Sequence, residues 1–512
     1  MSRTRIIGGK LTEIVGGDHN IYSASSIVTN SAKTITETGV EKGVTYGEPK
    51  DLPKQPPPPG TVDLTIGIFF DGTSNNRFNI EGRRKDKSLK RREDSDNDGS
   101  NVSFGNDNSN VDRLQTIYPK KDDYFSIYIE GIGTKEPKKN EDGSYTYYGD
   151  FTRGQGFGTG ETGLKEKARK GAADLFKELK KKGFIEIKSI TLDLFGFSRG
   201  AAAARMFANE IWKYNSGTDD VVLEEFTKSK LNIKLPKIKL RFIGIYDTVS
   251  SFDESNFSSD TVYDDQVKNK LLLKLNGSLG YVAHLTAENE YRKMFPLTNS
   301  KSMTSGIELT LPGCHSDIGG GYNDKDKEEV VIEGSYTTYV KQDRDRMIDQ
   351  GWYRPEQMKW RVGSSRVKGT RTGISNKYSY VVLHLMAEIA KRKYKIPWND
   401  GKMKKNFPIP DSLTPTKERL WAYAFDGVSR PKYYTKKVVD QELQSIEQKR
   451  AKKTLTQKEA DVYHQKSDDH NLLRSSRNQF LHFSASMDGI GKEPLRDPKT
   501  DIMKENRYII AG

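Results

Sequence analysis

The sequence predicts an α/β fold: a mainly parallel sheet with helices on both faces. Apolar runs of strand length occupy residues 61–70, 187–195 and 238–246. Segments with apolar residues at helical spacing occur along the same stretch, at 161–182 and 201–214. Strands that alternate with helices form parallel sheets, and such strands are almost wholly apolar because both faces are covered.

Each element has a local signal. The first strand ends at Asp71-Gly72, and a helix over 161–182 ends at Gly183, as glycine favours. The helical spacing there is carried by Leu164, Ala168, Ala172, Leu175 and Leu179. Further strands are expected at Tyr124–Ile129 and Ile307–Leu311. Residues 80–110 are polar and charged, which predicts a surface insertion.

The composition changes at both ends of this core. Residues 1–60 are rich in Gly, Ser and Thr and close with the proline-rich stretch Pro53–Gly60, typical of a stiff linker. Beyond residue 325 we expect a basic hairpin at 358–371, a helix at 378–391 and a polar segment at 433–475. The chain therefore divides into an N-terminal segment (1–60), a core (61–325) and an accessory or cap region (326–512).

The composition also excludes several classes of protein. No apolar run approaches the roughly 20 residues of a membrane-spanning helix, and a single cysteine, Cys314, excludes a disulfide framework. The first residues lack the apolar stretch of a Sec signal, so we expect cytoplasmic synthesis and, for any export, another machine. The net charge of +14 fits a solvated surface or attraction to anionic lipid. No nucleic-acid-binding motif accompanies it, so no nucleic-acid partner is expected.

The sharpest motif is the pentapeptide Gly196-Phe197-Ser198-Arg199-Gly200. It follows an apolar strand and precedes an alanine-rich helix, the context of a nucleophile elbow. Glycines on both sides let strand and helix approach, and the helix N-terminus favours a developing oxyanion. The motif predicts an α/β-hydrolase-like fold with Ser198 as the nucleophile.

A serine nucleophile in this fold is followed in the chain by an acid and then a histidine. Asp247 ends the strand at 238–246, and His315 follows the strand at 307–311 in a loop with three glycines. We therefore expect Asp247 as the acid and His315 as the base, with His482 as the main rival base. His284 is assigned to a packed helix near the site and His384 to the core. The histidines that are not considered candidates for the base are His19, His464 and His470.

The oxyanion hole is expected to use backbone N–H groups. One is that of Arg199, which follows the nucleophile. Another comes from the loop after the first strand, where Gly72 and Thr73 permit close backbone approach.

Six motifs in order resemble one family of proteins. They are Ile68–Asn76, Asn110–Leu114, Gly131–Thr134, Gly196–Ala201, Tyr246–Val249 and His315–Tyr322. Across residues 64–325 they resemble the α/β-hydrolase family that includes the type VI secretion phospholipase effectors of the first lipase-effector family. A weaker similarity occurs at Phe480–Ser484.

The resemblance implies the same triad, Ser198, Asp247 and His315, and phospholipase A activity at the sn-1 ester. It also implies an antibacterial toxin, made in the bacterial cytoplasm and carried by a contractile secretion machine into the periplasm of a target cell. The implied partners are a phospholipid membrane surface, a secretion spike or tube protein and a cognate immunity protein. Residues 1–60 match nothing in that family, and our hypothesis is that they load the enzyme onto the spike.

Two other motifs favour weaker interpretations. Asp94–Gly99 begins like a Ca²⁺-binding loop, but position twelve is Gly105 and the bidentate glutamate is missing, which favours a solvated acidic loop. Gly154–Gly160 is glycine-rich but lacks the strand and Lys-Ser/Thr of a phosphate loop, so it is interpreted as a flexible loop near the active-site mouth. No cofactor or metal is therefore required, and the segment Asp94–Gly99 gives only weak support for Ca²⁺. The alternative functions are a soluble carboxylesterase acting on small esters and a non-catalytic binding module carried by a secretion apparatus.

Overall fold

The computed structural model describes residues 35–37, 62–89, 102–184, 186–218, 221–252, 271–275, 277, 279–489 and 491–512. The chain divides into two compact units, Met1–Thr61 and Val62–Gly512. The hypothesis about residues 1–60 therefore lies outside the described residues, apart from 35–37.

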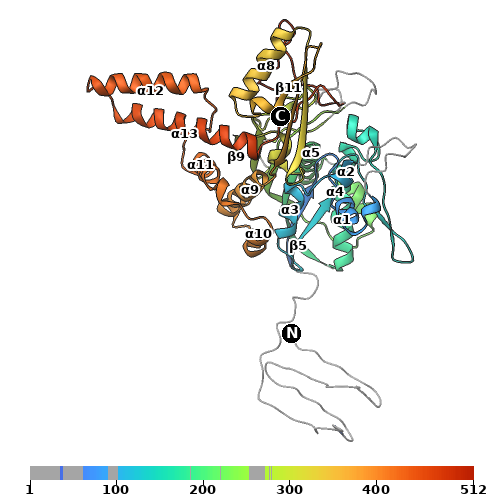
Figure 1. The fold of residues 1–512 in the computed structure, drawn as a ribbon. Coiled ribbons are helices and arrows are strands. Elements are labelled where there is room, and N and C mark those ends of the chain that lie inside the picture. Colours follow the sequence, from blue (N-terminus) through green and yellow to red (C-terminus); the bar gives the residue numbers. More distant parts are fainter. Residues whose placement is uncertain are drawn as a thin grey trace. The chain divides into compact units, whose positions relative to one another are not determined.

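Six strands form a parallel sheet (Figure 1). They are β1 (Val62–Phe70), β2 (Tyr124–Ile129), β5 (Ile187–Phe197), β6 (Ile238–Tyr246), β7 (Tyr281–Ala287) and β9 (Gly306–Leu311). Their order is β2-β1-β5-β6-β7-β9, and every neighbouring pair is parallel. The predicted α/β fold is confirmed. The assignment of His284 to a helix was wrong, because His284 lies in β7, a strand that the sequence analysis did not predict.

Two hydrophobic clusters cover the two faces of the sheet. Ile66 and Ile68 of β1 pack with α4 (Leu164–Lys182), α5 (Arg199–Ser216) and α6 (Val221–Ser229). Phe69, the residue after Ile68, points to the opposite face. There it packs with α3 (Asn110–Ile117), α7 (His315–Gly319) and α9 (Tyr378–Tyr394). This alternation follows from the two-residue period of a strand, and it explains why both faces of β1 are apolar.

The segment 80–110 is only partly the surface insertion that we predicted. Its described residues include the end of α1 (Arg77–Lys85), η1 (Lys87–Leu89) and α2 (Val102–Gly105). Ile80 and Phe104 are buried. The sequence did not predict this packing because two apolar side chains hardly change the polar character of so long a segment.

The C-terminal region adds a small sheet and several helices. The antiparallel strands β10 (Asp326–Glu333), β12 (Arg366–Ile374) and β11 (Met358–Trp360) lie in that order, and β11 and β12 form the predicted basic hairpin. The other elements are α8 (Thr337–Asp349), η3 (Pro355–Gln357), α10 (Asp400–Asn406), η4 (Asp411–Leu413) and α11 (Thr414–Phe425). Because α9 packs on β6 and β7, residues 326–512 also supply part of the core.

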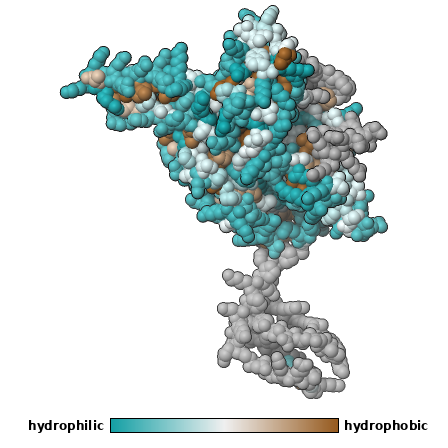
Figure 2. Space-filling model, in the orientation of Figure 1, coloured by the Kyte–Doolittle hydropathy of each residue, from teal (hydrophilic) through white to brown (hydrophobic). Residues whose placement is uncertain are grey.

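The predicted polar segment forms two long helices, α12 (Lys436–Ala451) and α13 (Gln457–Gln479), which project as a hairpin (Figure 1). Its visible surface is mostly hydrophilic with a few apolar side chains (Figure 2). The exposed apolar residues on it are Val438, Leu443 and Val462. None of the helices in the described part of the chain combines the length and apolar character needed to cross a bilayer.

Three short elements complete the unit. β3 (Lys138–Lys139) and β4 (Tyr145–Thr146) form an antiparallel pair, and Arg153–Phe157 forms the π-helical turn η2. Near the C-terminus, β13 (Ile509–Ile510) pairs in parallel with β8 (Leu297–Thr298). This pairing holds the end of the chain against the segment that follows β7.

A buried ion pair joins β2 to α4. The Lys167 ammonium donates to Glu130 Oε1 at 2.7 Å and to the Thr134 carbonyl at 2.8 Å, and both charged side chains are buried. We expect Lys167→Met to lower the free energy of unfolding by about 3 kcal/mol, because Glu130 loses its closest counter-charge inside the protein. The urea midpoint measures this. The matched variant Lys181→Met, at an exposed helical lysine, should change stability by less than about 0.5 kcal/mol; equal losses in both variants would contradict the assignment.

Candidate active site

Ser198 lies at a sharp turn between β5 and α5. Its backbone has φ 58° and ψ −131°, a strained combination for a residue with a side chain. The turn is possible because its two glycines have no Cβ, and each lies in close contact with backbone atoms of a neighbouring segment. A Cβ on Gly200 would lie 2.1 Å from the Asp71 carbonyl oxygen, and one on Gly196 would lie 2.6 Å from Ala201 Cα. This geometry is that of a nucleophile elbow.

Asp247 and His315 meet at the C-terminal edge of the sheet. Asp247 directly follows β6, and His315 begins α7 four residues after β9. His315 Nδ1 lies 2.6 Å from Asp247 Oδ2, and both side chains are buried. The Ser198 N–H donates to the Tyr246 carbonyl at 3.0 Å, which ties the elbow to the residue before Asp247. The three expected triad residues are therefore brought to one place.

The charges around this pair keep the acid ionised and the base neutral. Burial alone raises the pKa of Asp247, but the Arg507 guanidinium and His315 outweigh it and hold that pKa well below its usual range. Burial lowers the pKa of His315, and the hydrogen bond to Asp247 opposes this only in part. A neutral imidazole that donates through Nδ1 leaves Nε2 as a proton acceptor.

No direct hydrogen bond joins Ser198 to His315 in the described part of the chain. Within the described residues, the Ser198 hydroxyl and His315 Nε2 have no hydrogen-bond partner. The ring of Phe197, next to Ser198, lies 4.6 Å from the His315 ring. Such bonds are often long in a free enzyme and tighten when substrate binds.

The expected oxyanion donors differ in availability. The Gly72 N–H already donates to Asp71 Oδ1 at 2.7 Å, so it is the least available of the three. The N–H groups of Thr73 and Arg199 have no acceptor among the described residues. Arg199 is the first residue of α5, where a helix leaves its N–H groups unbonded.

The side chain of Arg199 connects the elbow to the glycine-rich loop. Its Nε donates to Thr73 Oγ1 at 2.9 Å and its Nη1 to the Gly154 carbonyl at 3.2 Å, while Nη2 donates to the Gln155 carbonyl. Burial lowers the pKa of Arg199 to about 10. The sequence analysis expected Gly154–Gly160 near the mouth of the site, and this arginine places the loop beside the candidate oxyanion donors.

A second buried ion pair supports His315. The His315 N–H donates to Glu290 Oε2 at 3.2 Å, and Arg292 binds both oxygens of Glu290 at 2.8 Å. The Arg292 guanidinium stacks on Phe295, whose ring contacts His315 edge-on at 5.0 Å. Sequence reasoning missed Glu290, Arg292 and Arg507, since none of them lies in a recognisable motif.

The other histidines occupy separate places. His482 also has a carboxylate partner, Asp317 at 2.7 Å, but its ring stacks on Tyr322 and its Nε2 is buried without a partner. His284 is buried between Ser300, Thr248 and Glu308. His384 lies in α9 and is within 2.8 Å of the Phe407 carbonyl. A neighbouring carboxylate alone therefore does not single out the base.

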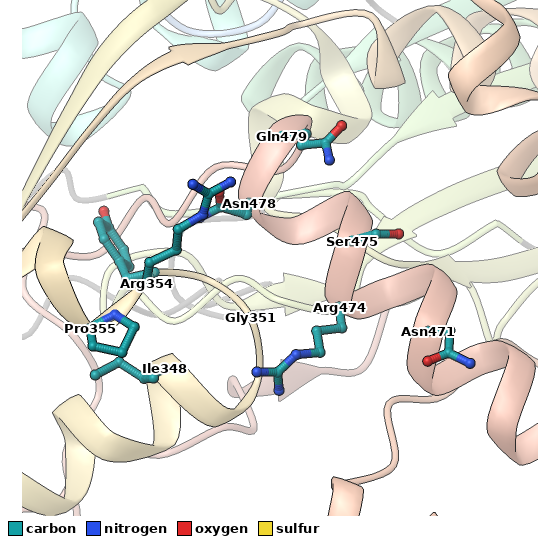
Figure 3. Close-up of a pocket in the computed structure, with 10 residues that line it drawn as sticks. Ile348, Gly351, Arg354, Pro355, Asn471, Arg474, Ser475, Asn478 and Gln479 are labelled. Carbon is teal, nitrogen blue, oxygen red and sulfur yellow. The ribbon is translucent and has the colours of Figure 1, made fainter.

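The part of the chain that the structure describes contains no group of three potential metal ligands. The Ca²⁺-like segment Asp94–Gly99 lies outside the described residues. An open cavity of about 400 Å³ lies between α8, η3 and α13, lined by Arg354, Arg474 and Asn478 among others (Figure 3). None of the residues that line this cavity belongs to the candidate site. The candidate site is therefore identified by the chemistry of Ser198, Asp247 and His315 and not by the position of this cavity.

Comparison with known proteins finds a family model that matches part of the chain. Residues 210–340, which include Asp247 and His315 but not Ser198, match the family model described as "T6SS, Phospholipase effector Tle1-like, catalytic domain". No curated protein matches.

Solved structures give a match over nearly the whole chain. A Tle1 effector bound to the VgrG spike from the type 6 secretion system is 20% identical, with 93% of this chain and 98% of that chain covered and a TM-score of 0.51. An uncharacterized protein from Pseudomonas aeruginosa is 18% identical over 82% of this chain and 64% of its own, with a TM-score of 0.33, too low to carry weight. The family model over residues 210–340 and the shared fold confirm the expected resemblance: this chain is similar to the Tle1-like phospholipase effectors of type VI secretion.

Proposed function

We propose that the protein is a serine-dependent esterase that hydrolyses acyl esters of membrane phospholipids. The observation that carries the proposal is the buried Asp247–His315 pair, 2.6 Å apart, beside a strained serine at a nucleophile elbow. A buried acid, a neutral histidine and a strained serine form the arrangement used for acyl transfer.

The residues divide the work as follows. His315 Nε2 takes the proton of the Ser198 hydroxyl as its oxygen bonds to the acyl carbonyl carbon. The N–H groups of Arg199 and Thr73 stabilise the oxyanion, and His315 then protonates the leaving lysophospholipid oxygen. Water, deprotonated by His315, releases the fatty acid from Ser198 and restores the free enzyme. None of these steps requires a metal ion or other cofactor.

The substrate and the biological role rest on the family. The family model describes a phospholipase effector, and the fold match is to an effector bound to a secretion spike. By this similarity, the chain is an antibacterial toxin of the type VI system that attacks the sn-1 ester in the target periplasm. It would travel on a spike protein and be neutralised in its producer by an immunity protein. The net charge of +14 favours contact with anionic lipid.

The test is fluorophosphonate labelling combined with fatty-acid release from phosphatidylethanolamine/phosphatidylglycerol vesicles. We expect label on the wild type and none on Ser198→Ala, because the probe bonds only to an activated serine. We also expect release from vesicles to exceed release from a short-chain soluble ester at equal acyl concentration. Label with activity only on the soluble ester would indicate a carboxylesterase. No label on either protein would indicate a non-catalytic module.

A further inference from the structure

Arg507 reaches the candidate triad from the C-terminal segment. Its Nη1 donates to Asp247 Oδ1 at 2.7 Å and to Oδ2 at 3.0 Å, and its Nε donates to the Phe295 carbonyl at 2.9 Å. The Arg507 side chain is 6% exposed and that of Asp247 is fully buried. The acid is thus bound both by the base and by this arginine, which lies 260 residues later in the chain.

Backbone hydrogen bonds hold the segment that carries Arg507. The Leu297 N–H donates to the Tyr508 carbonyl at 2.8 Å, and the Asn299 N–H donates to the Ile510 carbonyl at 3.0 Å. From the other side, Arg205 of α5 donates to the carbonyls of Thr298 and Asn299. The helix that begins at the nucleophile elbow and the segment that carries Arg507 therefore both form hydrogen bonds with residues 297–299, which include β8. The same framework thus positions the arginine and the serine.

Asp247 needs such a partner for a physical reason. A carboxyl group in a fully buried position tends to stay protonated unless an opposite charge lies close by. A protonated Asp247 would no longer orient the Nδ1–H of His315 or stabilise its positive charge. The other titratable groups near the pair are Glu290 and Arg292, which neutralise each other, and His284, whose pKa is lowered by burial. Among the described lysines and arginines, only Arg507 forms an ion pair with Asp247.

We propose that Arg507 is a positioning residue of the triad, which holds Asp247 ionised and correctly oriented toward His315. The C-terminal segment 507–512 is then part of the catalytic apparatus. The proposal rests on the proposed esterase function for its kinetic consequences, but the hydrogen bond that it explains can be measured without activity.

The kinetic test compares Arg507→Gln, Arg507→Lys and the control Lys504→Gln, at a partly exposed lysine three residues before Arg507 and outside the segment 507–512. Arg507→Gln should lower kcat on the order of 10²-fold, because a misplaced catalytic group has about this effect. Without the arginine the Asp247–His315 pair binds its proton more readily, so the acid limb of the kcat/KM profile should move up by about one pH unit or more. Arg507→Lys keeps the charge, so its acid limb should stay near that of the wild type. Lys504→Gln should match the wild type.

The second readout is the low-field Nδ1–H proton resonance of His315, assigned by its loss in His315→Gln. It should persist to lower pH in the wild type than in Arg507→Gln. An unchanged resonance and pH profile in Arg507→Gln would overturn the proposal. If Arg507→Gln does not fold, Arg507→Lys is the deciding variant, because it keeps the positive charge. An acid limb of Arg507→Lys that moves up by as much as is expected for loss of the charge would also overturn the proposal. If the wild type hydrolyses no ester, the proposed function fails, and the resonance alone still decides the role of Arg507.

Discussion

Replacing His315 with glutamine is expected to lower kcat for ester hydrolysis by about 10⁴- to 10⁶-fold, the loss found when the base of such a triad is removed. Glutamine can still donate a hydrogen bond to Asp247, so the buried carboxylate keeps one neutral partner as well as Arg507. It cannot accept the serine proton. Fatty-acid release from vesicles at neutral pH measures the loss, and the melting temperature reports whether the variant is folded.

The matched variant is His482→Gln. His482 has the same kind of partner, Asp317 at 2.7 Å, and is equally buried, so a generic effect of deleting a buried histidine would appear in both variants. We expect His482→Gln to keep kcat within about tenfold of the wild type, since among the described residues no hydrogen bond or ring contact joins His482 to Phe197 or Asp247. The reverse result, a large loss of kcat in His482→Gln and a small one in His315→Gln, would identify His482 as the base in place of His315.

Gly200→Ala is the second substitution with a large expected effect. The new Cβ would lie 2.1 Å from the Asp71 carbonyl oxygen and 2.5 Å from that of Phe70. Both are backbone atoms, so the elbow and the end of β1 must separate. We expect the free energy of unfolding to fall by at least about 3 kcal/mol, the upper part of the range for overpacking. Fluorophosphonate labelling of Ser198 should also be lost, because the same shift moves Thr73 away from Arg199.

The control is Gly105→Ala, since a Cβ there meets no atom within 4 Å. Gly105 is the last residue of a short helix, and the change should alter stability by less than about 1 kcal/mol in either direction. Urea denaturation of the two variants beside the wild type compares them directly. Equal stability of all three proteins would show that the close approach at the elbow is not required.

The sequence determined the elements that depend on local pattern. The apolar runs of β1, β5 and β6 predicted a parallel sheet, because strands covered on both faces leave a nearly continuous hydrophobic signal. The strand-glycine-serine-glycine-helix order predicted the elbow at Ser198, because the turn needs those residue types within five positions. Asp247 and His315 were predicted as the acid and base because each follows a strand whose end lies at the same edge of the sheet.

Local pattern was insufficient elsewhere. His284 was assigned to a helix because a short apolar run suits a buried helix as well as a buried strand, and only pairing with β6 and β9 decided for the strand β7. The burial of Ile80 and Phe104 in a polar stretch likewise depended on what packs against them.

The charged surroundings of the site were decided by the tertiary structure alone. Arg507 bonds to a residue 260 positions away, and Glu290 and Arg292 reach His315 from the segment after β7. A charge acts through distance in space, and no spacing in the sequence encodes which arginine will lie beside which buried carboxylate. The sequence by itself therefore predicted the candidate triad Ser198, Asp247 and His315, while the fold decided which charged side chains surround it.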